Sequence, residues 1–372
     1  MKINDVLEEL RKYKARDLDF SDGRILSSMC TSPHRLARRA FLEFIDTNLG
    51  DPGLFQGTKE LEEKAIRFMA ELFNSKEACG FICSGGTEAN ITALWVARNL
   101  SRKKEIIVPE TAHFSFIKAS NLLGLRLKVA KIDENHEVVI EDVRRKLDRK
   151  NTAAIVGIVG TTEYGSIDDI ESLSEIAEDR DIYLHIDAAF GGLVVPFLDI
   201  QRKFDFSLAG VCSITVDPHK MGMAPIPCGS ILFRNREFLE YISTPTPYLT
   251  QKRQHTLLGT RTGASAAAAY AMFRFFGREG YRKVVKRCMK VTYYLYEKIK
   301  SLGLEVFYPT MNILVFNTKD NERIFTEISK RGWMVSRTRK GEIRVVIMPH
   351  VKIKQAREFI GDLEEICGRF LE

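Results

Sequence analysis

The stretch CGFICSGGTEANITALWVARNL at residues 79–100 decides the fold. Residues 79–83 form a short apolar run, and residues 86–100 have the apolar spacing of a helix, with a glycine-rich turn between them. The same alternation predicts strands at 105–108, 125–130, 153–159 and 182–187, and helices at 114–123, 138–148 and 169–179. Such alternation is typical of an α/β protein with a mostly parallel sheet. Continuous apolar strands indicate that helices cover both faces.

After residue 200 the pattern changes. We predict strands at 213–216 and 229–233, helices at 264–277 and 280–301, strands at 304–307, 312–316, 332–336 and 343–347, and helices at 321–330 and 352–370. The last group is typical of a small α+β domain. We therefore predict an N-terminal segment (1–50), a large domain (51–290) and a small C-terminal domain (291–372), with the last boundary inside a long helix.

Composition narrows the class of protein. The chain has 372 residues, 45% of them hydrophobic and 28% charged, which excludes a disordered or collagen-like protein. Its apolar runs are shorter than the ~18–20 residues of a membrane span. The first residues, MKINDVLEELRKYK, lack the apolar core of a secretory signal. Seven scattered cysteines favour free thiols, so we expect a cytoplasmic protein without membrane contact.

Charge and cysteine spacing exclude two further kinds of site. The net charge of +7 favours anionic ligands. Its basic clusters at 102–104, 144–150 and 282–290 fall in helical patterns, so we interpret them as solvated faces and expect no nucleic-acid partner. Cys79 and Cys83 have the wrong spacing for a zinc knuckle, so we expect no metal.

The first motif that carries chemistry is SGGTEAN at residues 84–90. A glycine turn that opens a helix presents free N–H groups and the positive end of the helix dipole, which together bind anions. Ser84 and Thr87 add hydroxyl groups. The motif matches neither GxGxxG nor GxxxxGK[ST], so it does not indicate a nucleotide. An ordinary helix cap is the alternative interpretation.

Two more motifs follow, HIDAAFGG at 185–192 and DPHKMG at 217–222. Asp187 ends an apolar strand, and ligands of open α/β sheets bind at the carboxyl ends of strands. Lys220 comes 33 positions later, so one crossover can bring the two to the same cleft. A buried lysine can become a nucleophilic amine. The alternatives are a strand-end capping aspartate and a surface loop lysine.

The three motifs together fit one cofactor, pyridoxal 5'-phosphate. It needs a phosphate cradle, an acid for its ring nitrogen and a lysine that forms an imine with its aldehyde. We assign these roles to the turn at Gly86 and Thr87, to Asp187 and to Lys220. The acid keeps the ring nitrogen protonated, so that the ring withdraws electrons from the substrate Cα.

These motifs also resemble those of the group II pyridoxal-phosphate-dependent amino acid decarboxylases, over nearly the whole chain. Further stretches are similar to the archaeal L-tyrosine/L-aspartate decarboxylases, namely CTSP at 30–33, NLGDPGLFQGT at 48–58, TPYL at 246–249 and GTRTG at 259–263. The resemblance implies the type I, aspartate aminotransferase-like fold and a homodimer with active sites at the subunit interface.

The resemblance also implies residue roles. Lys220 would be the Schiff-base lysine, and Asp187 would pair with the ring nitrogen. His113 would stack on one ring face and Ala189 would pack on the other. The remaining cofactor contacts would come from Gly86, Thr87 and His219 or Ser213 at the phosphate, and from Thr161 and Thr162 near the ring oxygen.

Two further assignments concern the substrate. The resemblance implies that residues 243–255 form a mobile catalytic loop, in which Tyr248 protonates the carbanion after CO2 leaves; a packing tyrosine is the alternative. Arg344 has a guanidinium fork that suits a carboxylate, and matching positions in related enzymes touch the substrate. A structural salt bridge is the alternative for Arg344.

The implied reaction is the decarboxylation of an L-amino acid. Tyrosine would give tyramine for methanofuran synthesis, and aspartate would give β-alanine for coenzyme A synthesis. A second enzymatic hypothesis uses the same cofactor for a different bond, as in an aldehyde-lyase that cleaves a phosphorylated amino alcohol, an aminotransferase or a desulfurase. A third hypothesis, from another class, is a basic nucleic-acid-binding protein on a degenerate enzyme fold.

Overall fold

A computed structural model describes residues 2–370 of the chain; the outermost residues of the expected terminal domains lie outside this range. Its centre is a seven-stranded sheet with the order β1-β7-β6-β5-β4-β2-β3. Only β7 runs antiparallel to its neighbours, so the expected mostly parallel sheet is confirmed. The strands are β1 (Cys79–Cys83), β2 (Glu105–Pro109), β3 (Arg126–Ala130), β4 (Thr152–Ile158), β5 (Tyr183–Asp187), β6 (Val211–Val216) and β7 (Gly229–Phe233).

Alternate residues of each strand enter opposite cores. Ile106 and Val108 of β2 join one cluster of buried side chains, while Ile107 between them joins the other. This period of two is the pleat of a strand buried on both faces. The helices are α4 (Gly86–Ser101), α5 (Ser115–Leu123) and α8 (Glu237–Glu240) beside the first core, and α3 (Gln56–Leu72), α6 (Ile140–Lys146) and α7 (Ile170–Arg180) beside the second or at the sheet edge.

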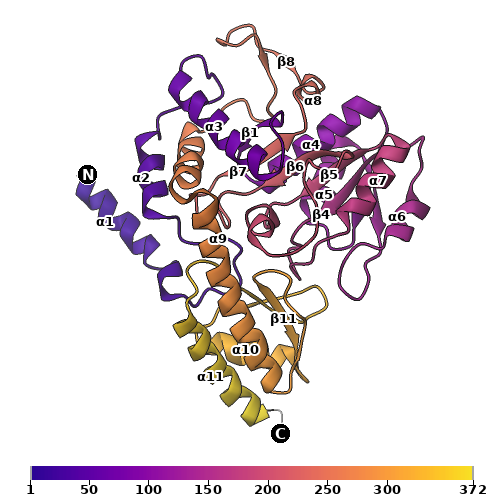
Figure 1. The fold of residues 1–372 in the computed structure, drawn as a ribbon. Coiled ribbons are helices and arrows are strands. Elements are labelled where there is room, and N and C mark those ends of the chain that lie inside the picture. Colours follow the sequence, from indigo (N-terminus) through magenta and orange to yellow (C-terminus); the bar gives the residue numbers. More distant parts are fainter. Residues whose placement is uncertain (1, 371–372) are drawn as a thin grey trace.

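The long helix α9 (Gly263–Ser301) joins the large sheet to the C-terminal part of the chain (Figure 1). We expected two helices here; they form one element with a break at Gly277, where φ is 53°. The predicted boundary at 290/291 therefore lies inside α9. Beyond it, a four-stranded antiparallel sheet has the order β10-β11-β13-β12, and its elements are β10 (Glu305–Val306), β11 (Ile313–Asn317), α10 (Asn321–Lys330), β12 (Ser336–Arg337), β13 (Ile343–Val346) and α11 (Ile353–Phe370).

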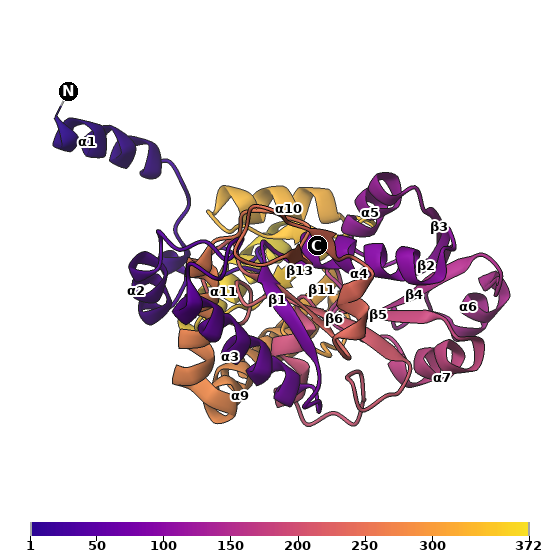
Figure 2. The same ribbon diagram turned by 90° about the horizontal axis from the view of Figure 1, so that it is seen from above.

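The N-terminal segment is attached to this smaller sheet. The amide N–H of Leu26 donates to the carbonyl of Met334, and the carbonyl of Leu26 accepts from the N–H of Val346, both at 2.7 Å. Residues 332–336 were expected to form a strand, and only Ser336 of that range lies in β12. Further along, α2 (Arg35–Glu43) packs on α9, whereas α1 (Ile3–Lys14) stands away from the body in Figure 2.

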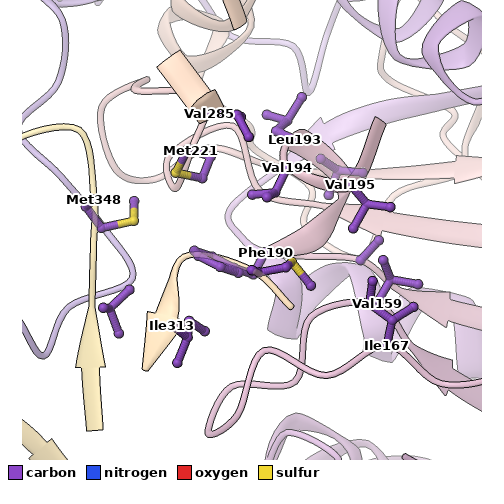
Figure 3. Close-up of a cluster of buried hydrophobic side chains, with 14 of the residues drawn as sticks. Val159, Ile167, Phe190, Leu193, Val194, Val195, Met221, Val285, Ile313 and Met348 are labelled. Carbon is purple, nitrogen blue, oxygen red and sulfur yellow. The ribbon is translucent and has the colours of Figure 1, made fainter. Parts of the chain in front are cut away.

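An apolar cluster supports the loop that contains Lys220. Met221, the next residue, is buried beside Leu193 and Val285, as Figure 3 shows. The same cluster continues through Phe190 to Ile313 of β11. Close packing of this kind allows side chains little freedom. The lysine loop is therefore held on a floor shared by the large and small sheets.

Two features lie apart from these layers. A short hairpin of β8 (Thr244–Pro245) and β9 (Arg253–Gln254) projects from the large domain within the predicted catalytic loop (Figure 1). Among the described helices, none is both long enough and apolar enough to cross a membrane.

Candidate active site

A cavity of about 410 Å³ lies at one edge of the large sheet. Strands β6, β5 and β4 are neighbours, and their carboxyl ends deliver Asp217, Asp187 and the 158–162 turn to the same place. This is where ligands bind in open α/β sheets. Further lining residues are Ser84, Gly85, Gly86, Thr87, Asn90, Thr111, His113, Phe114, Ala189, Phe190, His219 and Lys220.

Lys220 projects into this cavity beside a carboxylate. Its Nζ lies 3.0 Å from Oδ2 of Asp217. Burial alone would lower the pKa of Lys220, because a charged amine is poorly solvated there. The negative charges of Asp217 and Asp187 and the hydrogen bond to Asp217 outweigh burial and raise the pKa of Lys220 above its ordinary value. Lys220 is therefore held as a cation that donates a hydrogen bond to Asp217.

Asp187 is 6% exposed and held by two donors. The side-chain amide of Asn90 donates to its Oδ2 at 2.8 Å, and the backbone N–H of Ala189 donates to its Oδ1 at 3.1 Å. The carboxylate is thus fixed at the cavity wall.

The first turn of α4 forms another wall of the cavity. The first N–H groups of a helix have no partner within the helix and attract anions. A Cβ added at Gly86 would lie 3.0 Å from Oδ2 of Asp217 and 3.2 Å from Cβ of Ala189, so a side chain at this position would fill the cradle. Thr111 lines the cavity, and its buried hydroxyl has no hydrogen-bond partner within residues 2–370.

Two histidines also line the cavity. Nδ1 of His113 accepts the N–H of Ser115 at 3.2 Å, and Nδ1 of His219 accepts the N–H of Cys228 at 3.2 Å. Burial lowers the pKa of both imidazoles. Both nitrogens that accept these bonds carry no proton, which leaves Nε2 of each ring as the remaining donor.

Four predicted site residues do not line this cavity. Thr161 is fully buried and bonded to Ser166, whereas its neighbour Thr162 does line the cavity. The hydroxyl of Ser213 lies 2.8 Å from Nδ1 of His185 inside the sheet. Tyr248 is 86% exposed on the projecting hairpin.

Arg344, the fourth, is buried on β13. It donates from Nη1 to the carbonyl of Ser27 and to the hydroxyl of Ser336, at 3.1 and 3.0 Å. Its Nε and Nη2 have no hydrogen-bond partner, and it forms no ion pair, within the described part of the chain. Burial lowers the pKa of Arg344 to about 10, although the charge of Glu163 acts in the opposite direction. The guanidinium is therefore a buried cation with one free edge.

Sequence reasoning assigned no role to Asp217, Asn90 or Thr111. Asp217 follows β6 just as Asp187 ends β5, so its place at a strand end was a usable signal. Asn90 lies one helical turn after Gly86, on the face of α4 that meets the sheet. Thr111 has no comparable signal, since it is a single hydroxyl residue in the turn after β2.

The fold and this cavity define a class of enzyme that comparison with known proteins identifies. Residues 57–317 match the model of the pyridoxal-dependent decarboxylase conserved domain, and the chain belongs to this family. Its cofactor is pyridoxal 5'-phosphate. The residues present fit that group, because the cradle at Gly86, the buried acid at Asp187 and the lysine at Lys220 face one cavity.

Within the family, the chain is similar to archaeal enzymes over its full length. It is 49% identical to a probable L-aspartate decarboxylase of Archaeoglobus fulgidus, over 98% of this chain and 100% of that protein. It is 51% identical to a probable L-tyrosine/L-aspartate decarboxylase of Methanothermobacter thermautotrophicus, over 94% and 99%. A solved sphingosine-1-phosphate lyase of Burkholderia pseudomallei superposes with a TM-score of 0.91 at 27% identity, over 99% and 91%. The chain is thus a pyridoxal-phosphate-dependent amino acid decarboxylase.

The pairing of Lys220 with Asp217 predicts a pKa change. Asp217→Asn removes a negative charge that raises the pKa of Lys220, while burial continues to lower it. The titration midpoint of Lys220 is therefore expected at lower pH in the variant. A 13C NMR titration of labelled lysine in protein prepared without cofactor measures it, with Lys220→Ala for assignment.

Asp205→Asn is the matched control, because Asp205 is also buried but is bonded to Asn74 rather than to the lysine. In Asp205→Asn, the titration midpoint of Lys220 should equal that in the unmodified protein. An unchanged or higher midpoint in Asp217→Asn would show that the ion pair does not control the amine.

Proposed function

We propose that the chain decarboxylates L-aspartate, L-tyrosine or both, releasing CO2 with β-alanine or tyramine. One observation carries this proposal above the others: Lys220 and Asp187 face a single buried cavity at the first turn of α4. The names of the two archaeal relatives support these substrates. We further propose a cytoplasmic location and a place for the products in methanofuran or coenzyme A synthesis.

Pyridoxal phosphate supplies a conjugated ring that accepts the electron pair left on the substrate Cα when CO2 departs. The residues of the chain bind and polarise that ring. Lys220 would hold the cofactor, because its amine lies in the cavity where the aldehyde would bind. Asp187 would pair with the ring nitrogen, and its two hydrogen bonds hold the carboxylate in one orientation.

The remaining walls of the cavity would orient the cofactor. The N–H groups at Gly86 and Thr87 would bind the phosphate with Nε2 of His219. His113 would stack on one face of the ring and Ala189 would pack against the other. We assign the contact near the ring oxygen to Thr162 rather than Thr161, because the hydroxyl of Thr161 is already bonded to Ser166.

Arg344 would bind the substrate carboxylate. Its unpaired Nε and Nη2 form one edge of a guanidinium, and a carboxylate bonds such an edge through two parallel hydrogen bonds. A buried arginine without a counter-charge is costly, and an anionic substrate would offset that cost.

We also propose a homodimer with shared active sites. Tyr248 is exposed on a projecting hairpin, so a role for it in proton transfer to Cα needs the hairpin to enter a cavity. The cavity of a second copy offers one. In addition, α1 exposes the apolar side chains Ile3, Leu7 and Leu10, which are unfavourable in contact with water.

The first test is a product assay. The purified protein with pyridoxal phosphate is incubated with L-aspartate and L-tyrosine separately, and β-alanine, tyramine and CO2 are measured by mass spectrometry. The expected result is CO2 in equal amount to one or both amines. A bound cofactor without amine or CO2, but with aldehyde formed from a phosphorylated amino alcohol, would favour the lyase activity instead.

Arg344→Gln should weaken substrate binding. Removing the guanidinium that would pair with the substrate carboxylate is expected to raise KM by about 10- to 100-fold, with a smaller effect on kcat. Arg344→Lys is the control, since it keeps the charge but loses the forked guanidinium. Its KM should lie between those of the unmodified protein and Arg344→Gln. Steady-state kinetics measure both constants; an unchanged KM in both variants would leave Arg344 as a structural residue.

Mixed dimers test the shared site. Lys220→Ala and Tyr248→Phe proteins carrying different tags are co-expressed, and the species with both tags is purified. If Tyr248 acts in the cavity of the other subunit, one cavity of each mixed dimer is intact, and activity returns to about half that of the unmodified dimer. If Tyr248 acts in its own subunit, no cavity is intact and the mixed dimer stays as impaired as its parents.

A further inference from the structure

Behind Asp187, the side chain of Asn90 forms a complete set of hydrogen bonds. Its Nδ2 donates to Oδ2 of Asp187 at 2.8 Å and to the hydroxyl of Ser115 at 3.0 Å. Its Oδ1 accepts from Thr215 at 2.8 Å and from Nε2 of His185 at 3.0 Å. Two donors and two acceptor sites are all that an amide side chain has. Every one of them is used within the protein.

The chemistry of these partners fixes the direction of each bond. An ionised Asp187 only accepts, so the NH2 end of Asn90 must face it. The carbonyl end then faces His185, whose Nε2 must carry a proton because Thr215 already donates to the same carbonyl. The hydroxyl of Thr215, 3.3 Å from Nε2, is a second and longer contact of that N–H. Nδ1 of His185 is left as an acceptor, and the hydroxyl of Ser213, 2.8 Å away, must donate to it. One chain of donors thus runs from Ser213 to the carboxylate.

Position supports a role beyond packing. His185 and Ser213 are fully buried within β5 and β6 and do not line the cavity, whereas Asn90 and Asp187 do. Burial lowers the pKa of His185 to about 4, so the ring stays neutral at pH 7 and keeps a single proton. A neutral imidazole has one N–H donor and one acceptor nitrogen. With the proton on Nε2, the ring donates to the carbonyl of Asn90 and so favours one orientation of that amide.

We infer that His185 is a positioning residue that acts through Asn90 to hold the carboxylate of Asp187 in place and aimed at the cofactor ring nitrogen. This inference rests on the proposed role of Asp187. If His185 no longer donates, Oδ1 of Asn90 keeps only Thr215 as a partner, and the amide is free to turn its carbonyl toward Asp187. Two acceptor oxygens would then face each other, and their repulsion would displace the carboxylate from this position.

The tautomer can be tested in the unmodified protein, with one variant needed only to assign the signals. In protein labelled with 15N-histidine, the His185 imidazole signals are assigned by comparison with His185→Gln. At pH 7 we expect a neutral ring with the proton on Nε2. A proton on Nδ1, or a doubly protonated ring, would overturn the inference, because the direction of the relay would then be wrong.

The effect on the cofactor is tested with a pair of variants. His185→Leu removes the donor, and His185→Gln places an amide N–H close to the position of Nε2. The ring nitrogen of bound 15N-labelled pyridoxal phosphate reports its protonation by NMR. We expect less protonation and a cofactor dissociation constant about tenfold higher in His185→Leu. Recovery of both in His185→Gln would separate this role from bulk packing.

Two controls complete the design. Thr92→Val removes another fully buried hydroxyl on α4, which donates to the carbonyl of Glu88, and should change neither measurement. Asp187→Asn tests the underlying assignment: if ring protonation does not change there, the proposed role of Asp187 fails. If Asp187→Asn lowers protonation but His185→Leu changes only the melting temperature, the role of Asp187 stands and the relay is refuted.

Discussion

The arrangement of this site depends on placing a lysine cation inside the protein. An isolated ammonium is costly to bury, and its Coulombic pairing with Asp217 at 3.0 Å offsets that cost. This pair is local, because Asp217 and Lys220 lie three residues apart after β6. The second negative charge that acts on Lys220, Asp187, comes from β5, and it is brought near because β5 lies beside β6. The fixed strand order therefore determines the charge balance of the cavity. The apolar cluster around Met221 then holds the loop of Lys220 in place beside Asp217 and Asp187.

Much of this architecture could be predicted from local sequence. The strands of the large sheet lie within two residues of their expected bounds, because each is a short apolar run between turn residues. Lys220, Asp187, Gly86 and His113 line one cavity as their motifs suggested. Residues at strand ends and helix starts are placed by the sheet itself. Their convergence needs only the order of the strands, which βα connections restrict strongly.

The parts that could not be predicted depend on contacts between distant segments. The sequence suggested either His219 or Ser213 at the phosphate, and only the register of β5 with β6 shows that Ser213 faces His185 instead. Within the expected strand 332–336, Met334 lies outside β12 and instead accepts a hydrogen bond from Leu26, more than 300 residues away in the chain. No local pattern contains such a pairing. The helices α2 and α3 were also not predicted.

The two halves of the proposed site differ in construction. The cofactor side is built from buried strand ends, and its carboxylate at Asp187 is held by hydrogen bonds from Asn90 and Ala189. The substrate side would come from Arg344, tied to the N-terminal segment at Ser27, and from the projecting hairpin at Tyr248. A lyase shares this fold at a TM-score of 0.91, so the fold alone does not select the bond that is cleaved. We expect the choice of substrate and bond to reside in the outer half, where changes leave the charge balance around Lys220 intact.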